Sequence, residues 1–513
     1  MVAQNPEKRN HGRPVLVERQ LPEVHSQLDG MIQWIRQSAQ DGSSSYAVEQ
    51  GIFEKVLALG KSLFQAFLKH VGPGDFGESV TLDDGRVVHR AAEQHRRRLV
   101  TVFGEFTISR WVYAQHQKAK FEFIPTDQRL QLPVNDVSYL LQEWDQLLGV
   151  EQAFGQVREV IETILRLPQS VDTLERTNQQ MAAAAPVFRE SQGPVDMKKE
   201  GVLLVVTEDN KGIPMVRPVA EQPAGVHRTK GEKANKKQMA CIGCAYSVDR
   251  HIRTPEELVA TLFRDPDRPQ EQPPQAQNKR YWAELSRDID GETIRGQDLV
   301  FQQLQAEIAT RRQPEQWLVQ LCDGQASLET DRHAYLPEDP RTLDILDLMH
   351  VLPRVWEAAH VFQREGSADA TAFVRDHLTR ILHGGVGTVI GVWRRKATLQ
   401  GLRGAKKKSL AAICAFLEKN KHRMKYDEYL RRGCPVATGV IEGACRHVIK
   451  DRMERAGMRW KIPGAQAMLN LRTIHTNGDW IAFQAFRMDL ENECHYPYTK
   501  AFDARDWYAY QAA

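Results

Sequence analysis

The spacing of apolar and polar residues predicts helices and a small β region at the start of the chain. Through 51–68 apolar residues recur every three or four positions, as in an amphipathic helix, and the first 80 residues are expected to be mostly helical. The Gly-Pro-Gly sequence at 72–74 ends this pattern. Alternation over 105–113, after Gly104, then predicts a hairpin among short strands.

Three further helical patterns lie between 135 and 187. The last of them begins after Ser170, a favourable N-cap residue, and carries mainly polar side chains. Short helices with a polar final helix fit a helix-turn-helix that reads a DNA groove, and they fit a plain helical bundle equally well. Both interpretations remain open from the pattern alone.

The pattern changes after residue 195, where continuous apolar runs predict buried strands. The runs cover 201–207, 213–220, 239–248, 316–322 and 341–348, with a turn expected at 208–212 between the first two. A helix is expected over 254–263, a Pro- and Gln-rich loop over 265–279, a helical block over 352–432 and a last helix over 438–455. This order predicts an α/β fold, namely a ribonuclease H-like core with a mixed five-stranded sheet, interrupted by a helical insertion.

These changes divide the chain into six expected segments. They are an N-terminal helical region with a β-hairpin (1–124), a helix-turn-helix-like DNA-binding domain (125–195), the first part of the core (196–351), the helical insertion (352–433), the last core helix (434–480) and a C-terminal tail (481–513).

Composition is that of a globular protein, with 42% hydrophobic and 26% charged residues among 513. No run approaches the roughly 18 apolar residues of a membrane span, and the N-terminal residues lack the apolar core of a signal peptide. The seven cysteines are scattered, which fits reduced thiols. We therefore expect a cytoplasmic protein with neither disulfide bonds nor membrane contact.

Positive charge is concentrated in one part of the chain, although the net charge is only +3. Fifteen Lys or Arg stand against six Asp or Glu between 401 and 460. Such a block favours contact with a polyanion, while a solvated helix face explains it as well.

Two acidic residues follow strongly apolar runs. Asp209 and Asp323 each come directly after a predicted buried strand, where side chains reach the crevice at the edge of an open α/β sheet. Glu442 stands at the head of the basic helix. Three such carboxylates can hold two divalent ions about 3.5–4 Å apart, and Mg²⁺ prefers oxygen ligands. Singly, an Asp is usually a turn former and a Glu in a first helical turn is favoured by the helix dipole.

The basic helix carries a recognisable signature. The segment Cys434-Pro-Val-Ala-Thr-Gly-Val-Ile-Glu-Gly-Ala-Cys-Arg-His447 and its continuation through 472 resemble the ISKra-type bacterial insertion-sequence transposases. Upstream likenesses occur at 205–215 and 320–324, so that the resemblance spans roughly 125–485. It implies a DDE transposase, related to the Mutator-like class, that cleaves the ends of its element and transfers strands into target DNA.

The resemblance also implies roles for individual residues. Asp209, Asp323 and Glu442 match the catalytic acids that bind two Mg²⁺ ions, with Mn²⁺ as a substitute and Glu208 as a rival for the first position. Asp347 and His350 look like a supporting C/D-x-x-H motif. Many relatives carry paired cysteines near the N-terminal hairpin. Residues 111–118 have none, so no zinc is expected.

The expected partners are double-stranded DNA, as terminal inverted repeats and target, and further copies of the chain in a homodimer or larger assembly. Cys241 and Cys244 are expected to pack in a strand rather than bind metal. Trp393 is a candidate for stacking on an unpaired base, with core packing as the alternative. The basic residues expected to contact DNA are Arg228, Lys230, Lys236, Lys237, Arg394, Arg395, Lys406, Lys407, Lys408, Arg446, Lys450 and Arg452.

Two other functions remain compatible with these residues. The same acids would serve a ribonuclease H-like nuclease that cuts without strand transfer. A domesticated, non-catalytic DNA-binding protein would retain the basic residues without using the acids.

Overall fold

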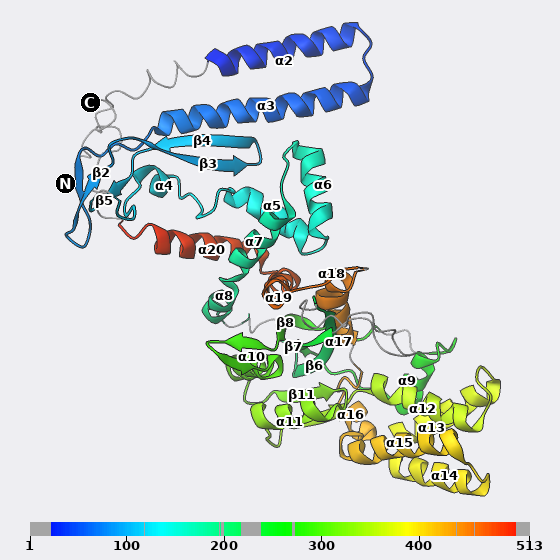
Figure 1. Ribbon diagram of the computed structural model, residues 1–513. Coiled ribbons are helices and arrows are strands. Elements are labelled where there is room, and N and C mark those ends of the chain that lie inside the picture. The colour runs from blue at the N-terminus through cyan, green and yellow to red at the C-terminus, as the bar shows by residue number, and fades with distance from the viewer. Residues whose placement is uncertain are drawn as a thin grey trace, which may run out of the picture. The chain divides into compact units, whose positions relative to one another are not determined.

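The computed structural model describes residues 22–116, 118–193, 195, 200–216, 237–268, 272–437, 439–455 and 457–498. Its internal contacts divide the chain into two compact units (Figure 1). One contains the residues up to Ala184 together with those from Ile481 onward, and the other spans Ala185–Trp480. The finer division into six segments stays a prediction.

The first unit opens with two long helices, α2 (Pro22–Gln40) and α3 (Ser45–Val71), which lie side by side (Figure 1). Ser44 caps α3 by accepting a hydrogen bond from the Ala47 amide, and the helix stops at Gly72, whose φ of 77° favours glycine. The expected helices before residue 80 and the break after them are confirmed.

Five short strands follow in two small sheets. β1 (Ser79–Thr81), β2 (Val87–Arg90) and β5 (Tyr113–Ala114) form an antiparallel sheet in the order β1-β2-β5. β3 (His95–Thr101) and β4 (Gly104–Arg110) pair from His95 with Arg110 to Thr101 with Gly104. The hairpin expected at Gly104 is therefore confirmed.

Helices complete this unit: α4 (Pro125–Arg129), α5 (Tyr139–Gly149), α6 (Phe154–Leu165), α7 (Val171–Ala182) and α20 (Trp480–His495). α5, α6 and α7 contact one another in pairs, and Ser170 caps α7 as expected. Asn178, one of the polar residues of α7, is buried and donates a hydrogen bond to Gln146 Oε1 at 2.8 Å. From α20, Arg487 donates to Gln142 Oε1 at 2.9 Å, so the chain beyond Trp480 adds a packed helix.

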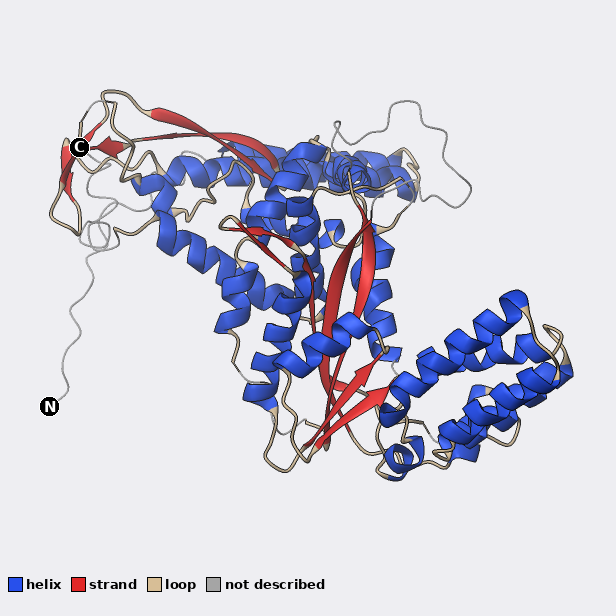
Figure 2. Ribbon diagram, turned by 60° about the horizontal axis from the view of Figure 1, so that its bottom comes forward, coloured by secondary structure: helices blue, strands red, loops and turns tan. Residues whose placement is uncertain are grey.

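The second unit is built on a mixed five-stranded sheet. Its strands are β6 (Leu203–Pro214), β7 (Lys237–Val248), β8 (Gln277–Leu285), β11 (Trp317–Cys322) and β12 (Thr342–Leu346), in the order β12-β11-β6-β7-β8. β7 pairs antiparallel with both β6 and β8, whereas β11 pairs in parallel with β6 and β12 in parallel with β11. Figure 2 shows its long strands among helices. The expectation of an α/β fold with a mixed five-stranded sheet holds at this level.

The expected turn at 208–212 is wrong. β6 is one twelve-residue strand whose polar middle pairs with β7, Asp209 opposite Ile242 and Gly212 opposite Met239. A continuous ladder of backbone hydrogen bonds holds this stretch extended, although Asp, Asn and Gly are poor strand formers. Of the second strand expected at 213–220, residues 213 and 214 are the end of β6, and 217–220 lie outside the described residues. β8, which was not foreseen, begins inside the expected loop.

Helices surround the sheet and form the insertion. They are α8 (Ala185–Ser191), α9 (Pro255–Leu262), α10 (Gly296–Arg311), α11 (Ala326–Tyr335), α12 (Leu348–Phe362), α13 (Ala368–Leu382), α14 (Val386–Leu399), α15 (Gly404–Asn420), the 3₁₀ turn η3 (Lys421–Arg423), α16 (Tyr426–Arg431), α17 (Gly439–Ala444), the π-helical segment η4 (Cys445–Lys450), α18 (Asp451–Met453) and α19 (Ile462–Thr476). A two-stranded ribbon, β9 (Arg287–Ile289) with β10 (Glu292–Ile294), precedes α10.

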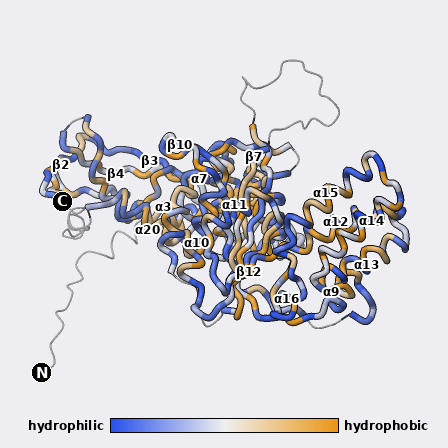
Figure 3. The backbone as a smooth tube through the Cα atoms, turned by 90° about the horizontal axis from the view of Figure 1, so that it is seen from below, coloured by the Kyte–Doolittle hydropathy of each residue, from blue (hydrophilic) through white to orange (hydrophobic). Residues whose placement is uncertain are grey.

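The helical block expected over 352–432 is confirmed as α12–α16, and the last helix as the run from α17 through α18. Figure 3 shows hydrophobic and hydrophilic residues interspersed along α12–α15, as in helices with one packed face.

The core of the second unit lies between the sheet and α10. Leu204 of β6, Phe301 and Leu304 of α10, and Leu318 of β11 are all fully buried there. Cys241 and Cys244 are buried in β7, as core packing predicts, and all seven cysteines of the chain are free thiols. Over the described residues, no helix is both long enough and apolar enough to cross a membrane.

Candidate active site

Asp209 and Asp323 occupy equivalent positions in the register of the adjacent strands β6 and β11. In the parallel pairing of β6 with β11, Leu321 lies opposite Thr207, and Asp323 and Asp209 each follow two residues later. β11 ends at Cys322, whereas β6 continues. Asp323 is therefore in the turn that leaves the sheet, and Asp209 lies within a strand rather than after one. Both side chains are partly exposed.

Hydrogen bonds fix the turn that carries Asp323. The Gln325 amide donates to Asp323 Oδ1 at 2.7 Å, and Asn210 Nδ2 donates to Gln325 Oε1 at 3.3 Å. The Asn210 amide in turn donates to Asp209 Oδ1 at 2.7 Å. Gly324 has a φ of 81°, and a Cβ there would lie 2.9 Å from Leu346 Cδ1. The turn therefore requires glycine directly after Asp323.

The two carboxylates affect each other electrostatically. Burial raises the pKa of Asp323, and the negative charge of Asp209 adds to the rise. The Gln325 amide, His350 and Arg332 oppose it. Like charges held at one sheet edge repel, and a cation between them relieves the repulsion.

A helix beside these strands carries Glu442. α17 contacts β6 and β7, and Cys445, which follows it, donates its thiol to Asp209 Oδ2 at 3.1 Å. Burial, and then the charge of Asp209, raise the pKa of the Cys445 thiol, so it stays a protonated donor. Glu442 is exposed and precedes Cys445 by three residues, about one helical turn.

The third acid does not complete a cluster with the other two. Among the described residues, no group of three or more His, Cys, Asp or Glu lies close enough together to hold a metal ion. The carboxylate oxygens of Asp209 and Asp323 are of the kind that Mg²⁺ prefers. The two Asp residues thus have the ligand chemistry for a hard cation, and Glu442 lies on the neighbouring helix α17.

Glu208, the rival for the first acid, points into the protein. It is 1% exposed, and Arg332 donates to its Oε1 at 3.0 Å. Burial raises the pKa of Glu208 to about 7 against the opposing charge of Arg332. Of the two neighbouring acids, Asp209 is the one that solvent and ligands reach.

Asp347 and His350 have different surroundings. Asp347 is 2% exposed and caps α12 by accepting a hydrogen bond from the Met349 amide at 2.7 Å. His350 is partly exposed, and its effect on the pKa of Asp323 shows that it lies within electrostatic reach of that carboxylate. His350 is therefore the better placed of the two to act on a bound group.

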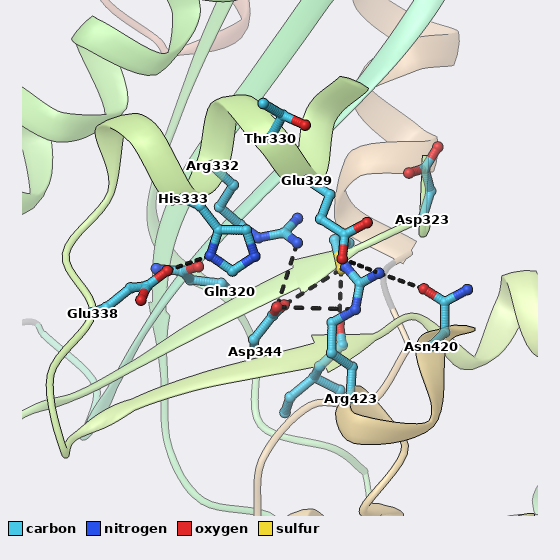
Figure 4. Close-up of polar contacts among 12 residues, drawn as sticks. Gln320, Asp323, Glu329, Thr330, Arg332, His333, Glu338, Asp344, Asn420 and Arg423 are labelled. Atoms are coloured by element: carbon cyan, nitrogen blue, oxygen red, sulfur yellow. Dashed lines mark hydrogen bonds and ion pairs between the residues drawn. The ribbon is translucent and has the colours of Figure 1, made fainter. Parts of the chain in front are cut away.

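Two buried arginines near Asp323 form a cluster of ion pairs with three acidic residues (Figure 4). We call this cluster the buried arginine network; its members are Glu208, Glu329, Arg332, Asp344 and Arg423. Arg332 of α11 joins Glu208 of β6, at 3.0 Å, to Asp344 of β12, at 3.4 Å. Arg423 of η3, which is fully buried, contacts Glu329 at 3.1 Å and approaches Asp344 at 3.9 Å. In Figure 4 Asp323 projects away from this network.

Sequence reasoning missed this network because its five members come from four separate elements, β6, α11, β12 and η3. Its contacts reach the residues adjacent to both central acids, since Glu208 precedes Asp209 and Arg423 Nη1 donates to the sulfur of Cys322 at 3.2 Å. Of its members, Asp344 lies inside an apolar run, 342–346, whereas Arg332 and Arg423 stand among other polar residues and give no such signal.

The basic residues outside the insertion are differently placed. Lys237 pairs with Glu454 at 2.6 Å, and Arg446 lies 3.5 Å from Asp451 with 72% of its side chain exposed. Lys450 is exposed. Three of the expected DNA contacts, Arg228, Lys230 and Lys236, lie outside the described residues.

Arg452 corrects an expectation, and Trp393 follows the core-packing alternative. Arg452 is 1% exposed and lies over the Trp460 ring, 5.0 Å from its centroid, so its guanidinium is used inside the protein rather than presented to a phosphate. Trp393 is fully buried and stacks with Phe373 at 6.2 Å between ring centroids, so it packs in the insertion rather than meeting a base.

In the insertion, Arg394, Arg395, Lys407 and Lys408 are exposed. Lys406 donates to the Val361 carbonyl at 3.2 Å. The insertion thus presents a basic surface, although one of its expected contacts is engaged within the fold.

Comparisons with known proteins leave the family open. No protein-family model matches the chain, and no curated protein matches it in sequence. Among solved structures, the Drosophila P element transposase strand transfer complex aligns over 68% of this chain and 80% of that one, with a TM-score of 0.23 and 9% identity. A likeness this distant carries no argument, and the ISKra-type resemblance stays a prediction.

Proposed function

We propose that the chain is a metal-dependent DNA transposase that cleaves the ends of a mobile element and joins them to target DNA. The strand order β12-β11-β6-β7-β8, with two parallel strands added to an antiparallel set, is compatible with a ribonuclease H-like core. The observation that carries the proposal is the equivalent position of Asp209 and Asp323 on neighbouring parallel strands.

In this proposal Asp209 and Asp323 hold divalent cations, and Glu442 is the third ligand. When bound, two Mg²⁺ ions supply activation of the attacking oxygen and stabilisation of the leaving oxygen of a phosphodiester. The chain's own residues set the geometry. The Gln325 and Asn210 amides fix one oxygen of each Asp, and Asp323 Oδ2 makes no hydrogen bond to a described residue. His350 lies within electrostatic reach of Asp323 and lowers the pKa of its carboxyl.

Glu442 would have to approach the two Asp residues for catalysis. The segment that follows it, η4, has π-helical hydrogen bonding, a form found mostly as short bulges and frequently at functional sites. We propose that binding of DNA and metal draws α17 towards the acids, with the Cys445 contact to Asp209 keeping the two elements adjacent beforehand.

The test is a cleavage and strand-transfer reaction on duplexes carrying the inverted repeats that flank the coding sequence, with and without Mg²⁺. Asp209→Asn, Asp323→Asn and Glu442→Gln should each abolish cleavage while binding of the ends persists. Glu365→Gln, which changes an exposed acid of the insertion in the same way, is the matched control. Retention of cleavage by Asp323→Asn would refute the proposal.

A pre-cut duplex with a free 3′-hydroxyl separates the remaining functions. Joining of this substrate to target DNA identifies a transposase, whereas cleavage without joining identifies a nuclease. Binding of the ends with no Mg²⁺-dependent chemistry identifies a non-catalytic DNA-binding protein. Because synapsis requires two ends, the active complex is expected to contain at least two copies of the chain, which light scattering with bound DNA measures.

A further inference from the structure

A cavity of about 460 Å³ lies in the helical insertion between the end of α14 and the start of α15. The two helices run side by side (Figures 1 and 3). The cavity has cationic side chains on its walls, from Arg394, Arg403 and Lys407, and apolar ones from Leu402, Leu410 and Ala411. None of its described lining residues is acidic. Ligand pockets of proteins span roughly 300–1,000 Å³, so its size suits a small organic group.

The cavity lies in a stretch of concentrated positive charge. Residues 394–408 contain seven Lys or Arg and no Asp or Glu. Lys396 lies over the Phe362 ring at 4.9 Å, and Lys406 donates to a backbone carbonyl, so both are engaged elsewhere. Arg403 and Lys407 form no ion pair with a described residue, whereas Arg394 lies beside the Cys414 thiol and 3.7 Å from Glu418 on the exposed surface.

The start of α15 adds to this positive potential. The helix begins at Gly404, Arg403 is its N-cap without a side-chain hydrogen bond, and its first turn contains no acidic residue. Free amides at a helix N-terminus carry partial positive charge, and basic side chains there oppose the helix dipole. An anion in the cavity would remove this repulsion.

The connection between the helices makes the cavity a formed feature of the fold. α14 ends at Leu399, Gly401 just beyond it has a left-handed φ of 59°, and the Leu402 amide donates back to the Ala397 carbonyl at 3.0 Å. The Gly401 amide donates to the Thr398 carbonyl at 3.1 Å. These two hydrogen bonds form a Schellman motif at the C-terminus of α14, and they hold Leu402 at the cavity.

We propose that this cavity binds a nucleotide. The phosphate lies among Arg394, Arg403 and Lys407, and the base lies against the apolar side chains of Leu402, Leu410 and Ala411. An inorganic anion alone would leave the apolar part of the cavity unfilled. The nucleotide comes either from an unpaired stretch of a DNA strand or from a free mononucleotide. The inference goes beyond the proposed cleavage reaction and does not depend on the acids of the central sheet.

The test measures binding of a fluorescent single-stranded oligonucleotide to the full chain by anisotropy at fixed salt, in the absence of Mg²⁺. Arg403→Gln combined with Lys407→Gln should weaken binding about tenfold or more, because it removes two charged contacts. Ala411→Trp, at an exposed helical position that tolerates a large side chain, should weaken it by filling the cavity. Arg364→Gln, an exposed cation of the insertion away from the cavity, should bind like the unchanged chain.

Competition distinguishes the two sources of the nucleotide. Displacement of the oligonucleotide by millimolar AMP, but not by inorganic phosphate, indicates a mononucleotide site; failure of AMP to compete while the variants weaken binding indicates a site for a DNA strand. Equal displacement by phosphate would overturn the proposal, as would unchanged affinity in the double variant or in Ala411→Trp. A chain that loses cleavage through Asp323→Asn should keep this binding, so failure of one proposal is separable from failure of the other.

Discussion

Removal of one cation from the buried arginine network should strongly destabilise the second unit. Arg332→Met keeps the approximate length of the side chain but deletes the guanidinium that meets Glu208 at 3.0 Å and Asp344 at 3.4 Å. The side chains of Arg332 and Glu208 are 1% and 0% exposed, so water cannot replace the lost partner. Leaving a buried charge uncompensated costs about 3–5 kcal/mol.

A double-mutant cycle measures how much of this cost belongs to the pair. Glu208→Gln should cost less than Arg332→Met, because the amide oxygen still accepts a hydrogen bond from the arginine. The double variant should be less destabilised than the two single effects added together, by about 0.5–3 kcal/mol. Urea unfolding gives the free energies, and hydrogen exchange of peptides from β6 and β11 assigns the loss to this unit.

Arg380→Met provides the matched control. Arg380 pairs with Asp376 at 3.0 Å, with about half of each side chain exposed, so its loss should cost less than about 1 kcal/mol. If Arg332→Met costs no more than Arg380→Met, the network does not stabilise the sheet and the reasoning fails.

Three further predictions concern single residues. Burial raises the pKa of Asp145 to about 7, above its unfolded value near 4, so the stability of the first unit should be full at pH 4 and fall as pH rises through 7. Asp145→Asn should be the more stable form at pH 8, by about 2–4 kcal/mol in urea unfolding, and a wild-type profile that is flat with pH would contradict this. Gly324→Ala should cost about 1–3 kcal/mol because of its left-handed φ and the contact with Leu346, and an unchanged unfolding midpoint would contradict it. Alkylation of the native chain should modify the exposed Cys494 well before the buried Cys445, which peptide mass spectrometry measures; equal rates would contradict the burial of the latter.

Local signals in the sequence predicted most of the elements. The N-cap at Ser170, the hairpin at Gly104 and the helical spacing of 352–432 act over a few residues and need no partner, so pattern and turn chemistry suffice. The path of β6 through 208–212 depends instead on pairing with β7, whose residues lie about thirty positions away. Long-range pairing overrode a strong local turn signal there.

In the candidate site, too, some residues were predictable from the sequence and others were not. The equivalent levels of Asp209 and Asp323 follow from apolar runs that end in acids, a pattern readable in the sequence. The roles of Arg332 and Arg423 were not readable, because a charged residue looks the same in sequence whether it ends in a buried pair or in water. For the same reason the burial of Arg452 was visible only in three dimensions.

The position of Arg423 within the insertion matters for any attempt to shorten the protein. A graft that exchanged residues 352–432 for a shorter linker would also delete the guanidinium that contacts Glu329 of α11 and approaches Asp344 of β12. Asp344 would keep Arg332 at 3.4 Å, whereas Glu329 would lose both Arg423 and Lys419. Any viable shortened form must therefore keep a cation beside Glu329 or neutralise this acid, which ties the evolutionary loss of the insertion to a simultaneous change in α11.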